Sequence, residues 1–502
     1  MSDTPVTDTD RSSTEGSGNS QLTELGVAAA AAAIRRGDIT AESYASSLLD
    51  QARTQSEIHS FVTIDESAVL AAARAADKTR AAGATAPLLG VPLGVKDSYQ
   101  TQDLPTSLGL GSLRNFAPST DAEIVTIIKG AGAIVFGKNN LVEMSYGVTG
   151  HNAEYGQVLN PYHHDHLSGG SSSGSAASVA ARIVPASLGG DTVGSIRVPA
   201  ALNGVVGYKP TTGRWPRGGV APISHTLDTT GLLARHVEDA LLIDQIVTGR
   251  VDDRRTVRSD LRGARFAYAP KHYLNLTDPE VERQFHDTVD RLREAGADVV
   301  AVDLGDDFTA LAERTAWNLF LRDTYQAVTA FLRENDYPVS VDDVHHSLKP
   351  QLQDVWSAAV LPGSPGYLSD EDYAAALGTD RPALQRRFAR VFERDGVDAL
   401  IFPTTPAPAP RIADQWEFTV AGQKVQHLFL AKNTVPASGA GLPGISLPAG
   451  LTRAGLPIGI ELNGAWSHDR ELLALALQVE RVLAPLPPPV WLGSTRHVDG
   501  RV

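Results

Sequence analysis

The chain has 502 residues, with 44 Lys or Arg against 58 Asp or Glu, so its formal net charge is −14 at pH 7. This balance argues against nucleic acid or an anionic membrane as the main partner, and no apolar run reaches the roughly 20 residues that span a bilayer. The sequence has no cysteine, which excludes a disulfide framework, a Cys-ligated zinc and a thiol nucleophile. Any covalent catalysis must therefore use an oxygen or a lysine.

Residues 1–20 are rich in Ser, Thr, Asp and Gly and carry almost nothing apolar, so we expect a disordered tail. The tail shows neither the basic nor the apolar region of a signal peptide, and we expect a cytoplasmic protein. An Ala-rich helical pattern follows over residues 22–53. Gly37 and Asp38 interrupt it, and Thr40 is the expected cap of the second helix.

Helical and strand-like patterns then alternate. Residues 124–130 and 281–296 have helical patterns, and each is followed by an apolar strand, at 133–136 and 299–301. This alternation is typical of α/β proteins. The Gly130-Ala-Gly132 element precedes its strand, whereas a dinucleotide fingerprint follows one, so we interpret it as a turn at a helix end.

The segment from about 305 to 395 has the weakest strand signal and contains several aromatic residues, among them Trp317, Phe320, Tyr325 and Trp356. We expect a mainly helical insertion near the substrate pocket. Its aromatic residues either wall the pocket or belong to an ordinary core. A further strand, at 397–402, leads into a rigid Pro-rich connector at 403–410.

Three stretches stand out chemically. Ser168 to Ser175 and Gly190 to Arg197 place hydroxyls among glycines, where the backbone can approach a ligand and direct N–H groups into a pocket. The third, Leu89 to Asp97, is an apolar, strand-like run that reaches Lys96. Because burial makes a lysine lose its proton more easily, Lys96 is a candidate base for a nearby serine.

Two rival motifs are weaker. Residues 170–174 fit the Gly-x-Ser-x-Gly elbow of α/β-hydrolases, but no apolar strand directly precedes them. The run His163 to His166 could supply metal ligands, yet four successive polar residues are more typical of a solvated loop, and no His-Glu-x-x-His helix accompanies them. We therefore expect neither a metal nor another cofactor.

The three stretches resemble the amidase signature family, serine hydrolases with a Ser–cis-Ser–Lys triad. The resemblance extends from about Leu22 to Pro485, and its further matches are Phe136–Asn140 with Glu143, Asn160-Pro161, Pro199-Ala200, Gly207–Thr211, Gly441–Pro443 and Gly455–Gly459. It implies one α/β domain at 21–486, with a large mixed twisted sheet flanked by helices on both faces, and a C-terminal tail at 487–502.

The resemblance also implies roles for individual residues. Ser195 would be the nucleophile, Ser171, after a cis peptide, the bridging serine, and Lys96 the base. The backbone N–H groups implied for the oxyanion hole are those of Thr192, Val193, Gly194 and Ser195. The residues implied for substrate binding are Met144, Gly169, Gly170 and Ser172, and those implied to brace the loop are Asp191 and Arg197.

A proton relay gives these roles their chemistry. A serine hydroxyl is a poor nucleophile until a base takes its proton, and a lysine can do so only when it is neutral. Ser171 would pass the proton, so Lys96 need not contact Ser195. One departure is Val193, which stands where the family usually has glycine. Since a β-branched residue disfavours positive φ, we expect that the loop needs none there.

Within the family, residues 200–217 and 222–231 look most like indoleacetamide hydrolases and mandelamide hydrolase, which cleave primary amides of arylacetic-type acids. This implies a small-molecule amide substrate and a monomer or homodimer, with no nucleic-acid or membrane partner. Anilides, carbamates and ureas stay open as substrates. A glutaminase subunit of a tRNA-dependent amidotransferase also stays open, although residues 214–217 depart from its usual run.

Overall fold

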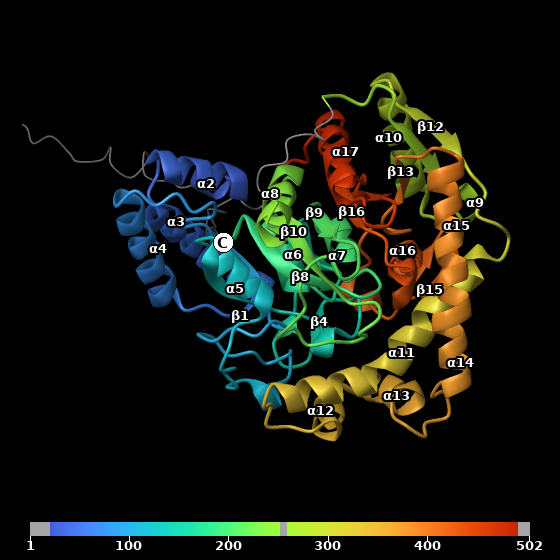
Figure 1. The fold of residues 1–502 in the computed structure, drawn as a ribbon, viewed down its shortest axis with the longest axis horizontal. Coiled ribbons are helices and arrows are strands. Elements are labelled where there is room, and N and C mark those ends of the chain that lie inside the picture. The colour runs from blue at the N-terminus through green and yellow to red at the C-terminus, as the bar shows by residue number, and fades with distance from the viewer. Residues whose placement is uncertain (1–20, 251–258, 490–502) are drawn as a thin grey trace, which may run out of the picture.

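The computed structural model describes residues 21–250 and 259–489 (Figure 1). The tail expected at 1–20 lies outside the described residues, and so does the tail expected at 487–502 apart from residues 487–489. In the part of the chain that is described, no helix combines the length and the hydropathy needed to cross a membrane.

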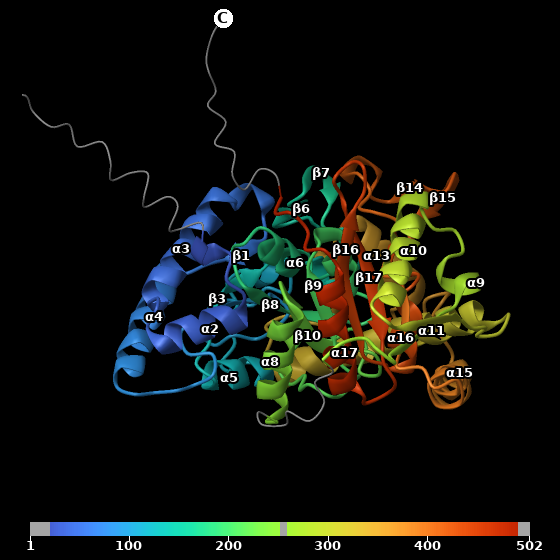
Figure 2. The ribbon, with the colours of Figure 1, turned by 90° about the horizontal axis from the view of Figure 1, so that it is seen from above.

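A mixed sheet of 11 strands organises the molecule (Figures 1 and 2). In sheet order the strands are β1 (Phe61–Thr63), β3 (Ile134–Asn139), β2 (Pro92–Lys96), β8 (Ala186–Asp191), β10 (Thr229–Ala234), β9 (Val206–Lys209), β16 (Gly444–Leu451), β17 (Pro457–Asn463), β13 (Ala399–Pro403), β11 (Arg265–Tyr268) and β12 (Asp298–Ala301). β2 runs parallel to β3 and β8, and β11 runs parallel to β12 and β13, whereas the other neighbours are antiparallel.

Helices cover both faces of the sheet (Figure 2). α7 (Arg197–Asn203) lies so close that a Cβ atom added to Gly207 of β9 would stand 2.4 Å from the Cβ of Ala200. The remaining helices around the sheet are α2 (Val27–Arg36), α3 (Ala41–Thr54), α4 (Glu66–Ala81), α5 (Glu123–Gly130), α6 (Ser173–Ala180), α8 (Val237–Thr248), α9 (Pro270–Tyr273), α10 (Pro279–Glu294), α16 (Val435–Ala440) and α17 (Asp469–Val482).

Local sequence signals account for several of these boundaries. Gly37 ends α2 with a φ of 80°, and the Thr40 side chain caps α3 by accepting a hydrogen bond from the Ser43 N–H. The expected turn at 130–132 is confirmed: Gly132 has a φ of 96°, and a Cβ atom there would lie 2.7 Å from the Cα of Leu89. Only glycine combines that φ with so close an approach to backbone.

Residues 308–394 are mainly helical and run along the lower and right-hand sides of Figure 1. The helices are α11 (Phe308–Glu334), α12 (Val341–Ser347), α13 (Pro350–Ala359), α14 (Asp370–Ala375) and α15 (Arg381–Arg394). Phe320 and Trp356 are buried against Tyr146, with ring centroids 4.8 and 5.6 Å from its ring. These two aromatic residues therefore belong to the core between this helical region and the sheet domain.

The expectation of a solvated loop at residues 163–166 is wrong. His163–Leu167 forms strand β7, which pairs with β6 (Leu159–Asn160). Exposed and partly buried side chains alternate along β7 up to buried Leu167, whose carbonyl accepts a hydrogen bond from the Asn160 amide. Two further hairpins lie outside the main sheet, β4 (His151–Asn152) with β5 (Gly156–Gln157) and β14 (Glu417–Val420) with β15 (Gln423–Gln426).

Candidate active site

Lys96 and Ser171 meet at the C-terminal ends of the interior strands β2 and β8. Lys96 is the last residue of β2, and Asp191 is the last residue of the parallel neighbour β8, so the two strands end side by side. Ser171 lies in the loop that leads into α6, after a cis Gly170–Ser171 peptide bond. The Lys96 Nζ donates a hydrogen bond to the Ser171 Oγ at 2.7 Å, and both side chains are buried.

The protonation state of Lys96 is set by its surroundings. Burial lowers the pKa of Lys96 to about 7, and the carboxylates of Asp191 and Asp228 oppose this shift. A lysine with this pKa is neutral in a large fraction of molecules at physiological pH, whereas an exposed lysine is almost fully charged. Lys96 can therefore accept a proton under ordinary conditions.

The loop between β8 and α7 presents a row of unused backbone donors. Within the described structure, the N–H groups of Thr192, Val193, Gly194 and Ser195 donate no hydrogen bond to a protein acceptor. Gly194 has a φ of 142°, and a Cβ atom there would lie 2.3 Å from the Thr434 Oγ1. Successive free amides of this kind can stabilise an oxyanion.

Val193 fits this loop without a strained backbone. Its φ is not positive, which confirms the expectation for this position. The side chain packs in the apolar cluster that also contains Met144 and Val198, and the carbonyl accepts a hydrogen bond from the Thr434 Oγ1 at 2.6 Å. The valine therefore anchors the loop from behind.

Ser195 is held beside the Ser171 loop by its backbone. Its carbonyl accepts a hydrogen bond from the Ser172 N–H at 3.1 Å, and the Ser172 hydroxyl bonds to the carbonyl of Gly190 at 3.1 Å. The described contacts include no hydrogen bond between the hydroxyls of Ser195 and Ser171. The structure thus brings the two loops together but leaves the last step of the relay open.

Two buried ion pairs of Arg197 hold the loop between β8 and α7. Arg197 pairs with Asp191 at 3.0 Å and with Glu461 of β17 at 2.7 Å, and all three side chains are inaccessible to solvent. The guanidinium also donates to the Ser438 hydroxyl at 2.7 Å. Arg197 therefore ties both ends of the loop to β17 and α16.

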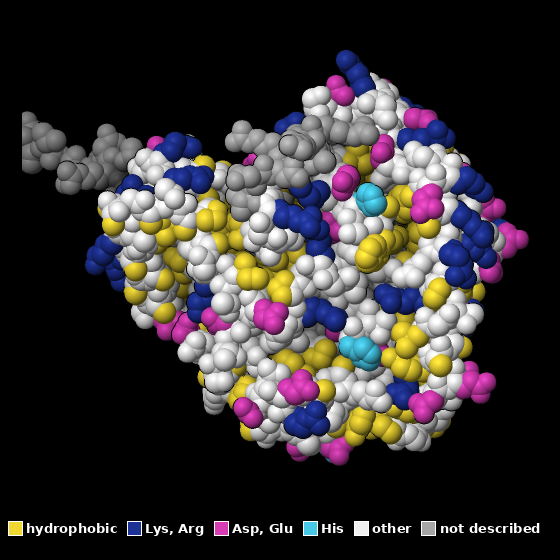
Figure 3. Space-filling model, viewed as in Figure 1, with side chains coloured by type: hydrophobic (Ala, Val, Ile, Leu, Met, Phe, Trp, Pro, Cys, Tyr) yellow, Lys and Arg dark blue, Asp and Glu magenta, His cyan; other side chains and the backbone are white. Residues whose placement is uncertain are grey.

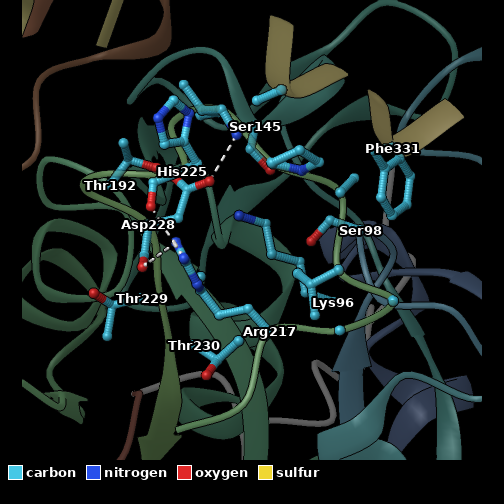
Figure 4. Close-up of a pocket in the computed structure, with 18 of the residues that line it drawn as sticks. Lys96, Ser98, Ser145, Thr192, Arg217, His225, Asp228, Thr229, Thr230 and Phe331 are labelled. Carbon is cyan, nitrogen blue, oxygen red and sulfur yellow. Dashed lines mark hydrogen bonds between the residues drawn. The ribbon is translucent and has the colours of Figure 1, made fainter. Parts of the chain in front are cut away.

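A cavity of about 320 Å³ opens onto Lys96 and Ser171 (Figure 4). Asp191 and Thr192 also line it, whereas Ser195, Val193, Gly194 and the residues expected to bind substrate, Met144, Gly169, Gly170 and Ser172, do not. The wall residues that sequence reasoning missed include Ser145, Arg217, Asp228 and Phe331. The one local signal for Asp228 was its place in the run 222–231, directly before Thr-Thr-Gly.

The aromatic residues expected near the pocket do not line this cavity. α11 instead contributes Ala327, Ala330, Phe331 and Glu334. Trp317 and Tyr325 pack, partly buried, against the same apolar cluster as Phe320.

The described residues contain no group of three or more His, Asp or Glu side chains placed to hold a metal ion, the His163–His166 run included. Basic and acidic side chains are interspersed over the face seen in Figure 3.

A family model described as Amidase matches residues 44–473. The chain belongs to the amidase family. The mandelamide hydrolase of Pseudomonas putida is 35% identical over 492 residues, which cover 95% of each chain. The indoleacetamide hydrolase of Allorhizobium ampelinum is 30% identical over 453 residues, which cover 90% of this chain and 96% of that one.

A solved structure supports the same assignment. The native peptide amidase of Stenotrophomonas maltophilia superposes with a TM-score of 0.75 at 28% identity, covering 93% of this chain and 98% of that one. The family resemblance and the expected α/β fold, with its large mixed sheet, are thereby confirmed. Family membership and this structural neighbour make the chain an amide-hydrolysing enzyme.

Proposed function

We propose that this amidase-family chain hydrolyses the C–N bond of small aryl or arylacetic primary amides to the carboxylic acid and ammonia, through an acyl-enzyme on Ser195. The observation that carries the proposal is the buried hydrogen bond from Lys96 to Ser171 beside a loop of four free backbone amides. A lysine that can be neutral supplies the base, and the free amides supply the oxyanion hole.

In the proposed first step, the Ser195 Oγ attacks the amide carbonyl carbon. Its proton passes to the Ser171 Oγ, and the Ser171 proton passes to the Lys96 Nζ. The N–H groups of residues 192–195 stabilise the resulting oxyanion. When the tetrahedral intermediate collapses, the C–N bond breaks, and the proton on Lys96 returns through Ser171 to the leaving nitrogen.

Water then completes the reaction. It attacks the acyl-enzyme carbonyl and loses a proton along the same relay, and the C–O bond to Ser195 breaks as the serine recovers its proton. The Ser195–Ser171 hydrogen bond that this sequence needs is absent from the described contacts. Catalytic hydrogen bonds commonly form only in the substrate complex, so this geometry is compatible with the relay.

The substrate class rests on the relatives and on the cavity. The two curated relatives are named for mandelamide and indoleacetamide, both primary amides of aryl-substituted acids. The cavity of about 320 Å³ is small enough to select compact molecules, and Phe331 with two alanines of α11 offers an apolar surface for an aromatic ring.

A matched substrate panel tests the proposal. Phenylacetamide, indole-3-acetamide, acetanilide, an aryl carbamate, an aryl urea and glutamine are incubated with the enzyme and with Ser195→Ala, and acid and amine or ammonia are quantified. We expect Ser195-dependent ammonia release, fastest from the two arylacetic amides. Preference for the anilide, carbamate or urea would reassign the leaving group, and glutamine hydrolysis alone would favour a glutaminase role.

A further inference from the structure

Asp228 is a partly buried acid in the cavity wall that the proposed chemistry does not use. One carboxylate oxygen accepts a hydrogen bond from the Thr192 Oγ1 at 2.7 Å. The other accepts from the N–H groups of Ile223 and Ser224 at 2.8 and 3.0 Å. The carboxylate therefore joins Thr192 of the candidate oxyanion loop to the segment Ile223–Ser224, of which Ile223 also lines the cavity.

Further hydrogen bonds hold the segment that contains Ser224. Asp323 of α11, which is buried, accepts a hydrogen bond from the Ser224 Oγ at 2.5 Å and another from the Tyr373 hydroxyl of α14 at 2.5 Å. Arg217 donates to the backbone carbonyl of Asp228 at 3.1 Å. Asp228 thus connects Thr192, through residues 223 and 224, to Asp323 of the helical region. A movement of the loop would break the hydrogen bond between Thr192 and Asp228.

Asp228 also places negative charge in the cavity that Lys96 enters. In Figure 4 the Lys96 side chain extends toward the cavity from the side opposite Thr192 and Asp228. Burial raises the pKa of Asp228 to about 6, so the carboxylate is ionised at pH 7 and above. Two ion pairs supply further titratable groups near Lys96: Asp191 pairs with Arg197, and Asp97 pairs with Lys138. The titratable groups on the cavity wall are Arg217, His225 and Glu334.

We infer that Asp228 is a positioning residue: it fixes the loop that carries the N–H groups of residues 192–195 and holds a negative charge opposite Lys96. This inference rests on the proposed function. Asp228 has two proposed effects, one on the position of the loop and one on the charge of Lys96, and different substitutions test each of them. The hydroxyl of Thr192 carries the positioning effect, and the charge of Asp228 acts on the protonation of Lys96.

The first test compares Thr192→Val, Thr192→Ser and the control Thr315→Val. Thr315 is a buried threonine of α11 whose hydroxyl bonds to the Leu311 carbonyl of its own helix. We expect Thr192→Val to lose roughly tenfold or more in kcat with a much smaller change in KM. Thr192→Ser keeps the hydroxyl and should recover most of the rate. Wild-type kcat in Thr192→Val, or equal losses in the Val and Ser variants, would overturn the positioning role.

The second test uses Asp228→Asn. The Asn Oδ1 can accept from both backbone N–H groups while its Nδ2 donates to the Thr192 Oγ1, so the contacts survive and the charge is lost. Without the facing carboxylate, Lys96 binds its proton less tightly, and the acid limb of the kcat/KM profile should move to lower pH. An unchanged acid limb would contradict the electrostatic part of the inference.

A substrate-independent readout keeps these tests separate from the proposed function. An aryl fluorophosphonate reacts with activated serines. The rate at which this reagent labels each variant is measured, and so is the thermal unfolding temperature of each variant. Slower labelling of Thr192→Val, in a protein that unfolds at the control's temperature, supports the inference whatever amide is the substrate. Labelling at the wild-type rate overturns it, whereas labelling that persists in Ser195→Ala contradicts the proposed function instead.

Discussion

The Lys96 Nζ lies 2.7 Å from the Ser171 hydroxyl oxygen, and among the described residues it has no other hydrogen-bond acceptor. Among the described contacts, the Ser171 hydroxyl is therefore the hydrogen-bond link between Lys96 and the rest of the site, while the carboxylates of Asp191 and Asp228 act on Lys96 through their charge. Both side chains of the Lys96–Ser171 pair are buried, and both line the cavity.

The activity should depend on the neutral form of Lys96. Because burial lowers the pKa of Lys96 to about 7, the fraction of active enzyme rises as pH increases through that region. We expect an acid limb of kcat/KM near this pH and its loss, together with most activity, in Lys96→Met. A flat profile between pH 5 and 9, measured with a neutral amide, would contradict the role of Lys96.

Ser171 and its neighbour Ser173 provide a matched pair. Ser171→Ala removes the hydroxyl that bonds to Lys96, and we expect a loss of roughly 100-fold or more in kcat. Ser173 is equally buried, and its hydroxyl makes a long contact of 3.5 Å with the Asn140 carbonyl. Ser173→Ala should stay within a few-fold of wild type in the same assay, and equal losses in both variants would indicate a packing effect.

Replacing Arg197 should destabilise the fold. Arg197→Met leaves Asp191 and Glu461 buried without their partner, and breaking a buried pair from one side costs about 3–5 kcal/mol. The solvent-accessible pair of Arg394 and Asp395 provides the control, for which Arg394→Met should leave the free energy of unfolding nearly unchanged. Denaturant unfolding measures both, and similar values would refute the bracing role.

Val193→Gly should slow every substrate alike. Val193 packs in an apolar cluster and does not line the cavity, so its removal loosens the loop and leaves the shape of the pocket unchanged. Lost packing and added backbone freedom together should cost roughly 2–4 kcal/mol of stability. The measurement compares kcat/KM for a small and a bulky amide. A tenfold or larger shift of their ratio toward the bulky amide would show instead that Val193 limits the acyl site.

The sequence was sufficient for those features that depend on residues close together in the chain. Gly37 and Thr40 mark a helix end and a helix start by local backbone preferences. The alternation of helix and strand predicted the α/β class, and the glycine-rich runs predicted where hydroxyls and free amides would gather. Val193 could be accommodated because its φ is decided within the loop itself.

Features made by distant residues were not accessible in this way. The bond from Thr192 to Asp228 spans 36 residues, and the bond from Ser224 to Asp323 spans 99. No local pattern identifies such partners, so Asp228 was missed as part of the cavity wall. The aromatic residues at 305–395 posed the same problem, because burial in a core and exposure to a pocket require the same residue types.

The most direct test of the proposed mechanism is to locate the acyl group on the enzyme. A 4-nitrophenyl ester of phenylacetic acid, whose good leaving group makes acylation fast, is mixed with the enzyme, and the reaction is stopped with acid. The digest is then examined by mass spectrometry. We expect the phenylacetyl mass on the peptide that contains Ser195, accumulating in the wild type and absent from Ser195→Ala. Acylation of Ser171, or of another residue while Ser195→Ala keeps its amidase activity, would contradict the assignment of Ser195 as the nucleophile.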